Sequence, residues 1–210
     1  MFRGVYHRFR NRYTLLRRKK HIENMRKRLL NHDFSLVSSN CNGACILHDL
    51  QVPFNSPFVN LWMKPDEYIK MLQNFRTYMS YELTFIQENG IDYPIGLLGD
   101  VRIYFQHYGS EEEAKQKWEE RSARLNYENL FILFTDRDGC TEQNLIDFDR
   151  IPYKNKVVFV HVPNNLIASA AYIRGFEKEE AVGLCMNYKH DYAYKKYYDD
   201  FDYVKWFNHG

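Results

Sequence analysis

Two short apolar runs, Leu130–Phe134 and Val157–Val160, constrain the fold of this chain more than any other feature. Both have the length of a strand, and neither alternates with polar residues, which is typical of strands buried on both faces of a parallel sheet. Between them, Thr141 suits the N-cap of a helix that ends near Phe148. This strand–helix–strand order predicts a single α/β domain with three layers, a mainly parallel sheet and helices on both faces.

A further strand and turn are predicted near the start of the domain. Residues 34–37 have β-character, the next residues form a polar turn, and a short apolar helix follows. In open α/β sheets, ligands bind at the turns that follow the carboxyl ends of parallel strands. Cys41 lies just before this helix, where unpaired N–H groups and the helix dipole favour a thiolate.

The remaining pattern predicts several other elements. We expect one long helix from Pro65 to about residue 88, with an apolar stripe that includes Leu83 and Ile86. Strands are expected at 95–98 and 101–105, separated by a tight turn or a bulge, and Ser110 with Glu113 forms a capping box for another helix. A short helix is expected from residue 166, and the tail 188–208 is expected to pack as a terminal helix.

The first 31 residues form a basic arm. They contain 11 Lys and Arg residues and one acid, Glu23, whereas the remainder holds 18 basic against 26 acidic residues. The arm is expected to be a basic amphipathic helix, with apolar positions Phe2, Tyr6, Phe9, Tyr13 and Leu16. Such a helix can bind an anionic membrane surface, contact a partner such as a glycosyltransferase, or pack on its own domain. The acidic body argues against a nucleic-acid partner. The predicted organisation is an arm at 1–31 and one domain at 32–210.

The cysteines and the hydropathy pattern predict a location. Four cysteines, no N-terminal apolar run of signal-peptide length and no stretch of 18 apolar residues favour a cytoplasmic protein with reduced thiols. A peripheral position on the inner face of the membrane is compatible with the basic arm.

The predicted turns at the carboxyl edge of the sheet supply a candidate nucleophilic site. Cys41 would attack, His107 would accept its proton, and Asp136 or Asp100 would orient the imidazole. Substrate contacts are expected from this first turn, with backbone N–H groups forming an oxyanion hole; its residues are Asn40, Asn42 and Gly43. The same residue types also occur as a buried thiol, a structural histidine and turn-forming carboxylates, so both interpretations stay open.

Two other groups of charged residues are candidates for ligand binding. Arg121 and Arg124 are three positions apart on a predicted helix and suit a phosphate or a carboxylate, although Arg121 can also pair with a nearby acid. Asp136 and Asp138 could hold a divalent cation for a nucleotide sugar, or simply shape a turn. No resident metal or cofactor is predicted, because metal-ligand spacing is incomplete and no phosphate-binding or dinucleotide-binding glycine loop is present.

Several motifs resemble those of a bacterial family catalogued as a domain of unknown function, whose members are often labelled exopolysaccharide biosynthesis proteins. The matching stretches span most of the chain after residue 33 and are 38–43, 56–61, 93–96, 105–108, Trp118, Arg121, 124–126, 138–141 and 201–208. The resemblance implies a single α/β domain whose genes lie among those for capsule or surface polysaccharides, and gives added weight to Asn40, Cys41, His107 and the two arginines. Ala44 stands where the family pattern has a second glycine.

These observations lead to three functional hypotheses. The first is a transferase or hydrolase of surface-polysaccharide biosynthesis that uses Cys41 and His107 in acyl-transfer chemistry on an activated sugar or a lipid-linked glycan. The second is a metal-assisted glycosyltransferase that uses Asp136 and Asp138. The third is a non-catalytic accessory protein that docks on polysaccharide enzymes through its basic arm.

Overall fold

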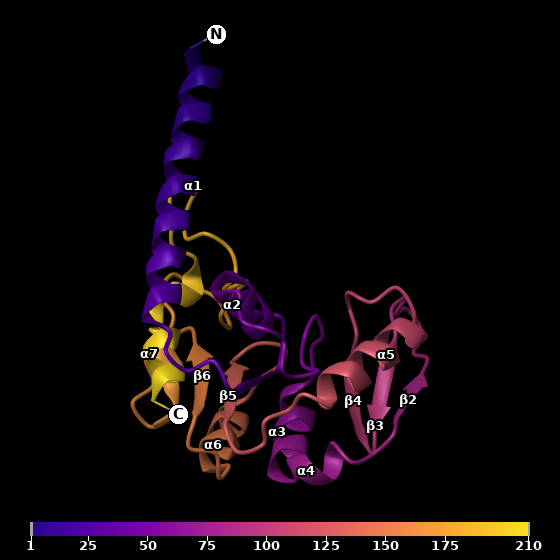
Figure 1. Cartoon of the computed structure of the whole chain (residues 1–210). Helices are drawn as coiled ribbons and strands as arrows, with labels where there is room; N and C mark the ends of the chain where they lie inside the picture. Colours follow the sequence, from indigo (N-terminus) through magenta and orange to yellow (C-terminus); the bar gives the residue numbers. More distant parts are fainter. Residues whose placement is uncertain (1, 210) are drawn as a thin grey trace.

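The computed structural model describes residues 2–209, with side chains from residue 12 onward. In chain order the elements are α1 (Phe2–Arg28), β1 (Ser35–Ser38), α2 (Asn42–Leu50), α3 (Pro65–Gln73), α4 (Phe75–Tyr78), β2 (Leu83–Ile86), β3 (Ile95–Leu98), β4 (Val101–Tyr104), α5 (Glu111–Ser122), β5 (Leu130–Thr135), α6 (Glu142–Arg150), β6 (Lys156–Val160), β7 (Ala170–Tyr172), the 3-10 helix η1 (Tyr197–Asp200) and α7 (Tyr203–Asn208) (Figure 1).

A parallel sheet forms the centre of the molecule. Its strand order is β1-β5-β6-β7, and every neighbouring pair is parallel. Strand β5 occupies an inner position, and all six of its residues, the apolar run Leu130–Phe134 and Thr135, are buried. Tyr68 on α3 has no exposed surface, and its hydroxyl bridges the carbonyls of Val37 and Leu133 at 3.0 and 3.2 Å. The predicted α/β class with a mainly parallel sheet is confirmed.

Alternate residues along the strands of this sheet belong to two separate hydrophobic clusters, one on each face. Val37, Ile132 and Val158 pack with residues of α3 and α6, whereas Leu36 and Phe131 pack with residues of α1, α2 and α7. Because side chains alternate across a strand, both faces of each central strand are covered by helices. The sheet therefore has helices on both faces.

A second, antiparallel sheet of order β2-β3-β4 lies beside the first, with α5 next to it (Figure 1). The predicted strands at 95–98 and 101–105 are confirmed as a hairpin, closed by Gly99 with φ of +62°.

The predicted single helix through Ile86 is wrong. The chain leaves helical geometry at Asn74, and residues 83–86 form a strand against β3. Leu83 and Ile86 keep a helical spacing by coincidence, but Leu-Thr-Phe-Ile is also a sequence with high β-propensity.

Two other expected helices differ from the structure. The residues after Leu166 lead into β7, not into a helix. The tail forms one helix only over Tyr203–Asn208, preceded by η1 and by irregular chain. Both predicted N-caps form: Ser110 Oγ accepts the Glu113 N–H at 3.2 Å, and Thr141 caps α6. The capping box predicted at Ser110 is incomplete, because the Glu113 side chain accepts the N–H of Gly109 instead.

Helix α1 extends well beyond the remainder of the molecule (Figure 1). Its C-terminal half packs on the domain through Arg18, Ile22 and Met25, all of which are buried. Of the apolar stripe predicted for the arm, the side chains of Phe2, Tyr6 and Phe9 lie outside the described residues, whereas Tyr13 and Leu16 are exposed. In the part of the chain that the structure describes, no helix combines the length and apolarity needed to cross a bilayer.

Candidate functional site

A cavity of about 390 Å³ lies where β1 and β5 end, at the carboxyl edge of the parallel sheet. This is the position at which open α/β sheets bind ligands. We refer to it as the edge cavity, and its lining residues are Asn40, Cys41, Trp62, Gln106, His107, Arg137, Asp138, Leu184 and Met186.

The turn from β1 into α2 is held by its own side chains. Asn40 Nδ2 donates to Thr135 Oγ1 at 2.7 Å, which ties this turn to the end of β5. The Asn42 N–H donates to Asn40 Oδ1 at 3.2 Å, and the Gly43 N–H donates to Ser38 Oγ at 3.3 Å. A Cβ on Gly43 would lie 2.6 Å from Ser38 Cβ, so only glycine fits there. Both N–H groups are therefore engaged, and neither residue lines the cavity, which argues against the predicted oxyanion hole.

Cys41 faces the edge cavity with a protonated thiol. Its Sγ lies 3.8 Å from the carbonyl oxygen of Leu61, to which the thiol can donate a weak hydrogen bond. Burial raises the pKa of Cys41 to about 11, nearby Cys45 adds to the rise, and the positive charge of Arg137 opposes it. The shift is opposite to the one that a position before a helix N-terminus predicts, because the loss of solvation outweighs the effect of the backbone.

His107 lies on the opposite wall from the sheet turns, in the loop that follows β4. Its side chain is exposed and lines the same cavity as Cys41. The sequence placed His107 on a turn of the parallel sheet, but it follows a strand of the antiparallel sheet. Trp62 is held beside it by two backbone hydrogen bonds to Tyr104, of 3.0 and 2.9 Å, and by stacking of the two rings at 4.1 Å. The antiparallel sheet thus supplies one side of the cavity.

The turn after β5 supplies a charged pair. Arg137 Nη2 lies 3.9 Å from Asp138 Oδ1, and Nη1 donates to the carbonyl of Gly183 at 3.5 Å. Burial raises the pKa of Asp138, whereas Arg137 lowers it. Asp138 has φ of +60°, a left-handed conformation that Asp tolerates in turns. Because both of these contacts are long, the N–H groups of the Arg137 guanidinium can still donate hydrogen bonds to an anionic ligand.

Asp136 does not line the edge cavity and does not contact His107. Its Oδ2 accepts hydrogen bonds from the backbone N–H and from Nδ1 of His161, at 2.8 and 2.6 Å. Its Oδ1 accepts the N–H of Val182 at 2.7 Å. The other proposed orienting carboxylate, Asp100, binds Lys70 and the hydroxyl of Tyr78 at the hairpin turn. Neither carboxylate orients His107 as the sequence predicted.

The two arginines expected at the site also lie elsewhere. Arg121 Nη1 donates to the Tyr108 hydroxyl at 2.6 Å, and its guanidinium is 5.7 Å from the Phe54 ring centroid. Arg124 is exposed beyond the end of α5. Neither lines the edge cavity.

Sequence reasoning missed five lining residues: Trp62, Gln106, Arg137, Leu184 and Met186. Arg137 and Gln106 could have been found, since each is adjacent to a residue that the sequence had already singled out. Leu184 and Met186 lie in irregular chain, where no periodicity indicates which side chain faces a cavity.

Comparison with known proteins gives two results. The family model described as "Domain of unknown function (DUF1919)" matches residues 12–208. The chain is also 50% identical over 185 residues to an uncharacterized protein of Haemophilus influenzae, which covers 88% of this chain and 89% of that relative. The predicted resemblance to a family of unknown function is thereby confirmed.

Proposed function

The chain belongs to the DUF1919 family, and we propose that its edge cavity binds an activated sugar and transfers a group to or from it during surface-polysaccharide biosynthesis. One observation carries this proposal: Cys41, His107 and Arg137 line the same cavity at the carboxyl edge of the sheet. The proposed role in polysaccharide biosynthesis rests on the resemblance of the sequence motifs to a family whose members are often labelled exopolysaccharide biosynthesis proteins.

In this proposal the cavity recognises a sugar joined to a phosphate. Arg137 would bind the phosphate, because a guanidinium is suited to bidentate contacts with phosphate oxygens. The exposed part of Trp62 would cover the apolar face of the sugar ring, and Asn40 and Gln106 would lie beside its hydroxyl groups.

The transfer step would use His107 as general base and Cys41 as nucleophile. As Sγ of Cys41 forms a bond to the carbonyl carbon of an acyl group, its proton passes to His107, and the bond from that carbon to the donor breaks. His107 then gives this proton to the departing group of the donor and becomes neutral again. An acceptor hydroxyl attacks the carbonyl carbon of the thioester and passes its proton to His107, the carbon–sulfur bond breaks, and His107 returns the proton to Sγ. With a pKa of about 11, Cys41 is protonated at neutral pH, so the base has to act during the attack.

A second candidate is direct transfer without a covalent intermediate, and the raised pKa of Cys41 favours it. In this route His107 or Asp138 would take the proton from the acceptor hydroxyl, and Arg137 would stabilise the leaving phosphate. A metal-assisted route through Asp136 and Asp138 has less support, because both oxygens of Asp136 are occupied by His161 and Val182.

We propose that the protein acts in the cytoplasm. Cys41, Cys45, Cys140 and Cys185 are free thiols, as expected in a reducing compartment. Activated sugars would meet the edge cavity there.

Calorimetric titration with nucleoside-diphosphate sugars and sugar phosphates, with and without Mg²⁺ or Mn²⁺, tests the binding. We expect Arg137→Ala to weaken binding about tenfold or more, as expected for loss of a charged hydrogen bond. Arg124→Ala, which removes an exposed arginine that does not line the cavity, is the matched control and should bind as the wild type does. Absence of any binding, or equal binding by Arg137→Ala, would contradict the proposal.

Kinetics with a bound donor separate the two routes. His107→Ala should lower the rate by about 10²–10⁴-fold in the covalent route. Cys41→Ser should abolish that route and leave direct transfer almost unchanged. If Cys41→Ser, His107→Ala and Asp138→Asn all leave the rate unchanged, the edge cavity is not the catalytic site.

A further inference from the structure

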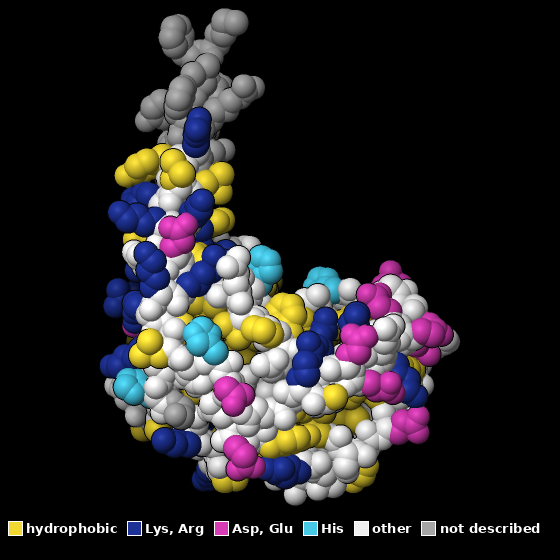
Figure 2. Space-filling model, in the orientation of Figure 1, with side chains coloured by type: hydrophobic (Ala, Val, Ile, Leu, Met, Phe, Trp, Pro, Cys, Tyr) yellow, Lys and Arg dark blue, Asp and Glu magenta, His cyan; other side chains and the backbone are white. Residues whose placement is uncertain are grey.

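The projecting half of α1 carries an exposed apolar belt, which we define as Tyr13, Leu15 and Leu16. Their relative exposures are 62%, 61% and 58%. Figure 2 shows these apolar side chains gathered on the part of α1 that stands away from the domain. The side chains by which α1 packs on the domain lie further along the helix and are Arg18, Ile22 and Met25. The belt is therefore not the face by which α1 packs on its own domain.

The belt covers a wide part of the helix circumference. Successive residues of an α-helix are about 100° apart, so Tyr13, Leu16 and Leu15 together span about 160°. A narrow apolar stripe would suit packing against a single partner helix. A wide apolar band suits a lipid layer, which contacts a broad face of the helix.

Strong positive charge accompanies the belt. Residues 12–28 contain eight Lys or Arg residues and one acid, Glu23. Arg18 is used inside the protein, where it pairs with Asp49 and Asp199. Arg26 is half-buried and donates to the Asp49 carbonyl at 2.9 Å, and Arg28 pairs with Asp202, whereas the other five basic side chains are exposed. Figure 2 shows Lys and Arg side chains along α1, while acidic side chains gather near α5. If the belt bound a second copy of the chain, the positive charges of the two α1 helices would repel each other. An anionic surface would instead attract them.

A basic pocket lies directly after the belt. It has a volume of about 200 Å³ and is lined by Arg17, Lys20, His21, Asn24 and Tyr194. The Arg17 guanidinium is held over the Tyr194 ring at 4.1 Å from its centroid. Its size and charge suit one phosphate group, and the belt next to it suits the acyl boundary of a lipid layer.

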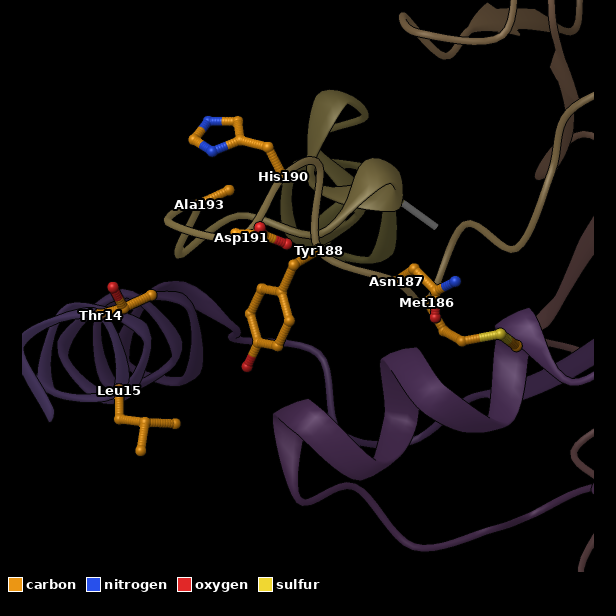
Figure 3. A pocket seen from close by; sticks show the side chains of 8 residues that line it. All are labelled: Thr14, Leu15, Met186, Asn187, Tyr188, His190, Asp191 and Ala193. Atoms are coloured by element: carbon orange, nitrogen blue, oxygen red, sulfur yellow. The ribbon is translucent and has the colours of Figure 1, made fainter. Parts of the chain in front are cut away.

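A groove lies between the belt and a residue of the edge cavity, Met186. Leu15 of α1 lies on one side of it, Met186 on the other, and the Tyr188 ring extends between them (Figure 3). This groove has a volume of about 600 Å³, and Met186 also lines the edge cavity beside Cys41.

We propose that α1 anchors the protein peripherally to an anionic phospholipid surface. The belt enters the boundary between headgroups and acyl chains, and the Arg17–Lys20 pocket binds a lipid phosphate. The groove, which Leu15 of the belt lines, then lies next to the membrane surface. The anchoring does not depend on the proposed chemistry, since it can be measured with lipid alone.

Vesicle sedimentation of the full chain tests the anchoring. We expect binding to vesicles of phosphatidylglycerol and phosphatidylcholine to be at least tenfold stronger than to phosphatidylcholine alone, and to weaken as salt is raised. Lys20→Ala should weaken binding about fivefold, because one basic residue near the surface is lost. Lys154→Ala, an equal change of charge at an exposed position away from α1, should have no effect.

Apolar substitutions test the belt separately. Tyr13→Ser with Leu16→Ser should reduce binding at least tenfold, whereas Leu166→Ser, which removes an even more exposed leucine from another segment, should not. Circular dichroism verifies that each variant is folded. Equal binding to neutral and anionic vesicles, or no binding to either, would overturn the proposal. So would a dimer of the wild-type chain that the belt substitutions dissociate, since the belt would then cover a second copy.

Discussion

The Asp136 carboxylate and the His161 imidazole pair at 2.6 Å between Oδ2 and Nδ1. The same carboxylate accepts the backbone N–H groups of His161 and Val182. One buried side chain thus joins the ends of β5 and β6 and fixes the start of segment 182–186. That segment carries Leu184 and Met186 to the wall of the edge cavity.

Asp136→Asn should destabilise the protein. The amide has one acceptor oxygen, so at least one of the buried donors from His161 or Val182 loses its partner or faces the new –NH₂ group. We expect the free energy of unfolding to fall by about 1–3 kcal/mol in urea titrations. Asp138→Asn is the matched control, because its carboxylate makes only a 3.9 Å contact with Arg137, and it should change stability by less than about 0.5 kcal/mol. Equal losses in the two variants would show that the Asp136 contacts contribute little.

The alkylation of Cys41 should follow an alkaline profile. With a pKa of about 11, only about one thiol in ten thousand is ionised at pH 7. Iodoacetamide labelling read by mass spectrometry should therefore accelerate roughly tenfold per pH unit between pH 7 and 10. Arg137→Ala should slow labelling at each pH, because the positive charge of Arg137 lowers the pKa of this thiol. A rate that levels off near pH 7 would instead reveal a thiolate stabilised by a partner.

The sequence predicted the parallel sheet and the place of the cavity because those features are encoded locally. Uninterrupted apolar runs such as Leu130–Phe134 suit only a strand covered on both faces, and the turns after such strands necessarily meet at one edge. This reason holds for Cys41, which follows β1, but not for His107: His107 lines the same cavity, yet it follows β4 of the antiparallel sheet, which packs beside that edge.

The side-chain partners could not be predicted in the same way. Nothing in the local sequence shows that Asp136 turns toward His161 and Val182, which are 25 and 46 positions away. The burial that raises the pKa of Cys41 comes from tertiary packing, which opposes the local influence of the helix N-terminus. Residues 83–86 similarly keep a helical spacing but pair with β3, because tertiary pairing overrides local pattern.

Arg121 should act as a structural residue and not as a ligand. Its guanidinium donates to the Tyr108 hydroxyl, which itself donates to the Val59 carbonyl at 2.8 Å. Arg121→Ala removes this charged hydrogen bond and the contact with the Phe54 ring. We expect a loss of about 1–3 kcal/mol in the free energy of unfolding. Arg124→Ala, at an exposed neighbouring position, should change it by less than about 0.5 kcal/mol. The reverse order of the two losses would contradict this assignment.

Acid should weaken the attachment of α1 to the domain. Burial alone would raise the pKa of Asp49, but the hydrogen bond from Tyr198 and the charges of Arg18 and Lys196 outweigh it, so the pKa is lowered. Burial would also raise the pKa of Asp199, but the hydrogen bond from His21 and the charge of Arg18 outweigh it, so that this pKa is lowered too. A carboxylate with a depressed pKa in the folded state stabilises the protein above its ordinary pKa of 3.8, and this contribution is lost as the pH falls below that value.

Urea unfolding between pH 7 and pH 2, for the wild type and for Asp49→Asn, measures this contribution. The variant should be less stable at pH 7, because Lys196 then loses its counter-charge and Arg18 keeps only Asp199 of its two buried carboxylates. The difference should persist down to about pH 4 and shrink at lower pH, by at most about 1.4 kcal/mol per pH unit for one carboxylate. Two stability curves that stay parallel down to pH 2 would mean that Asp49 is not stabilised by these cations. Exposed carboxylates such as Glu177 also have a lowered pKa, but they titrate in both proteins and cancel in the difference.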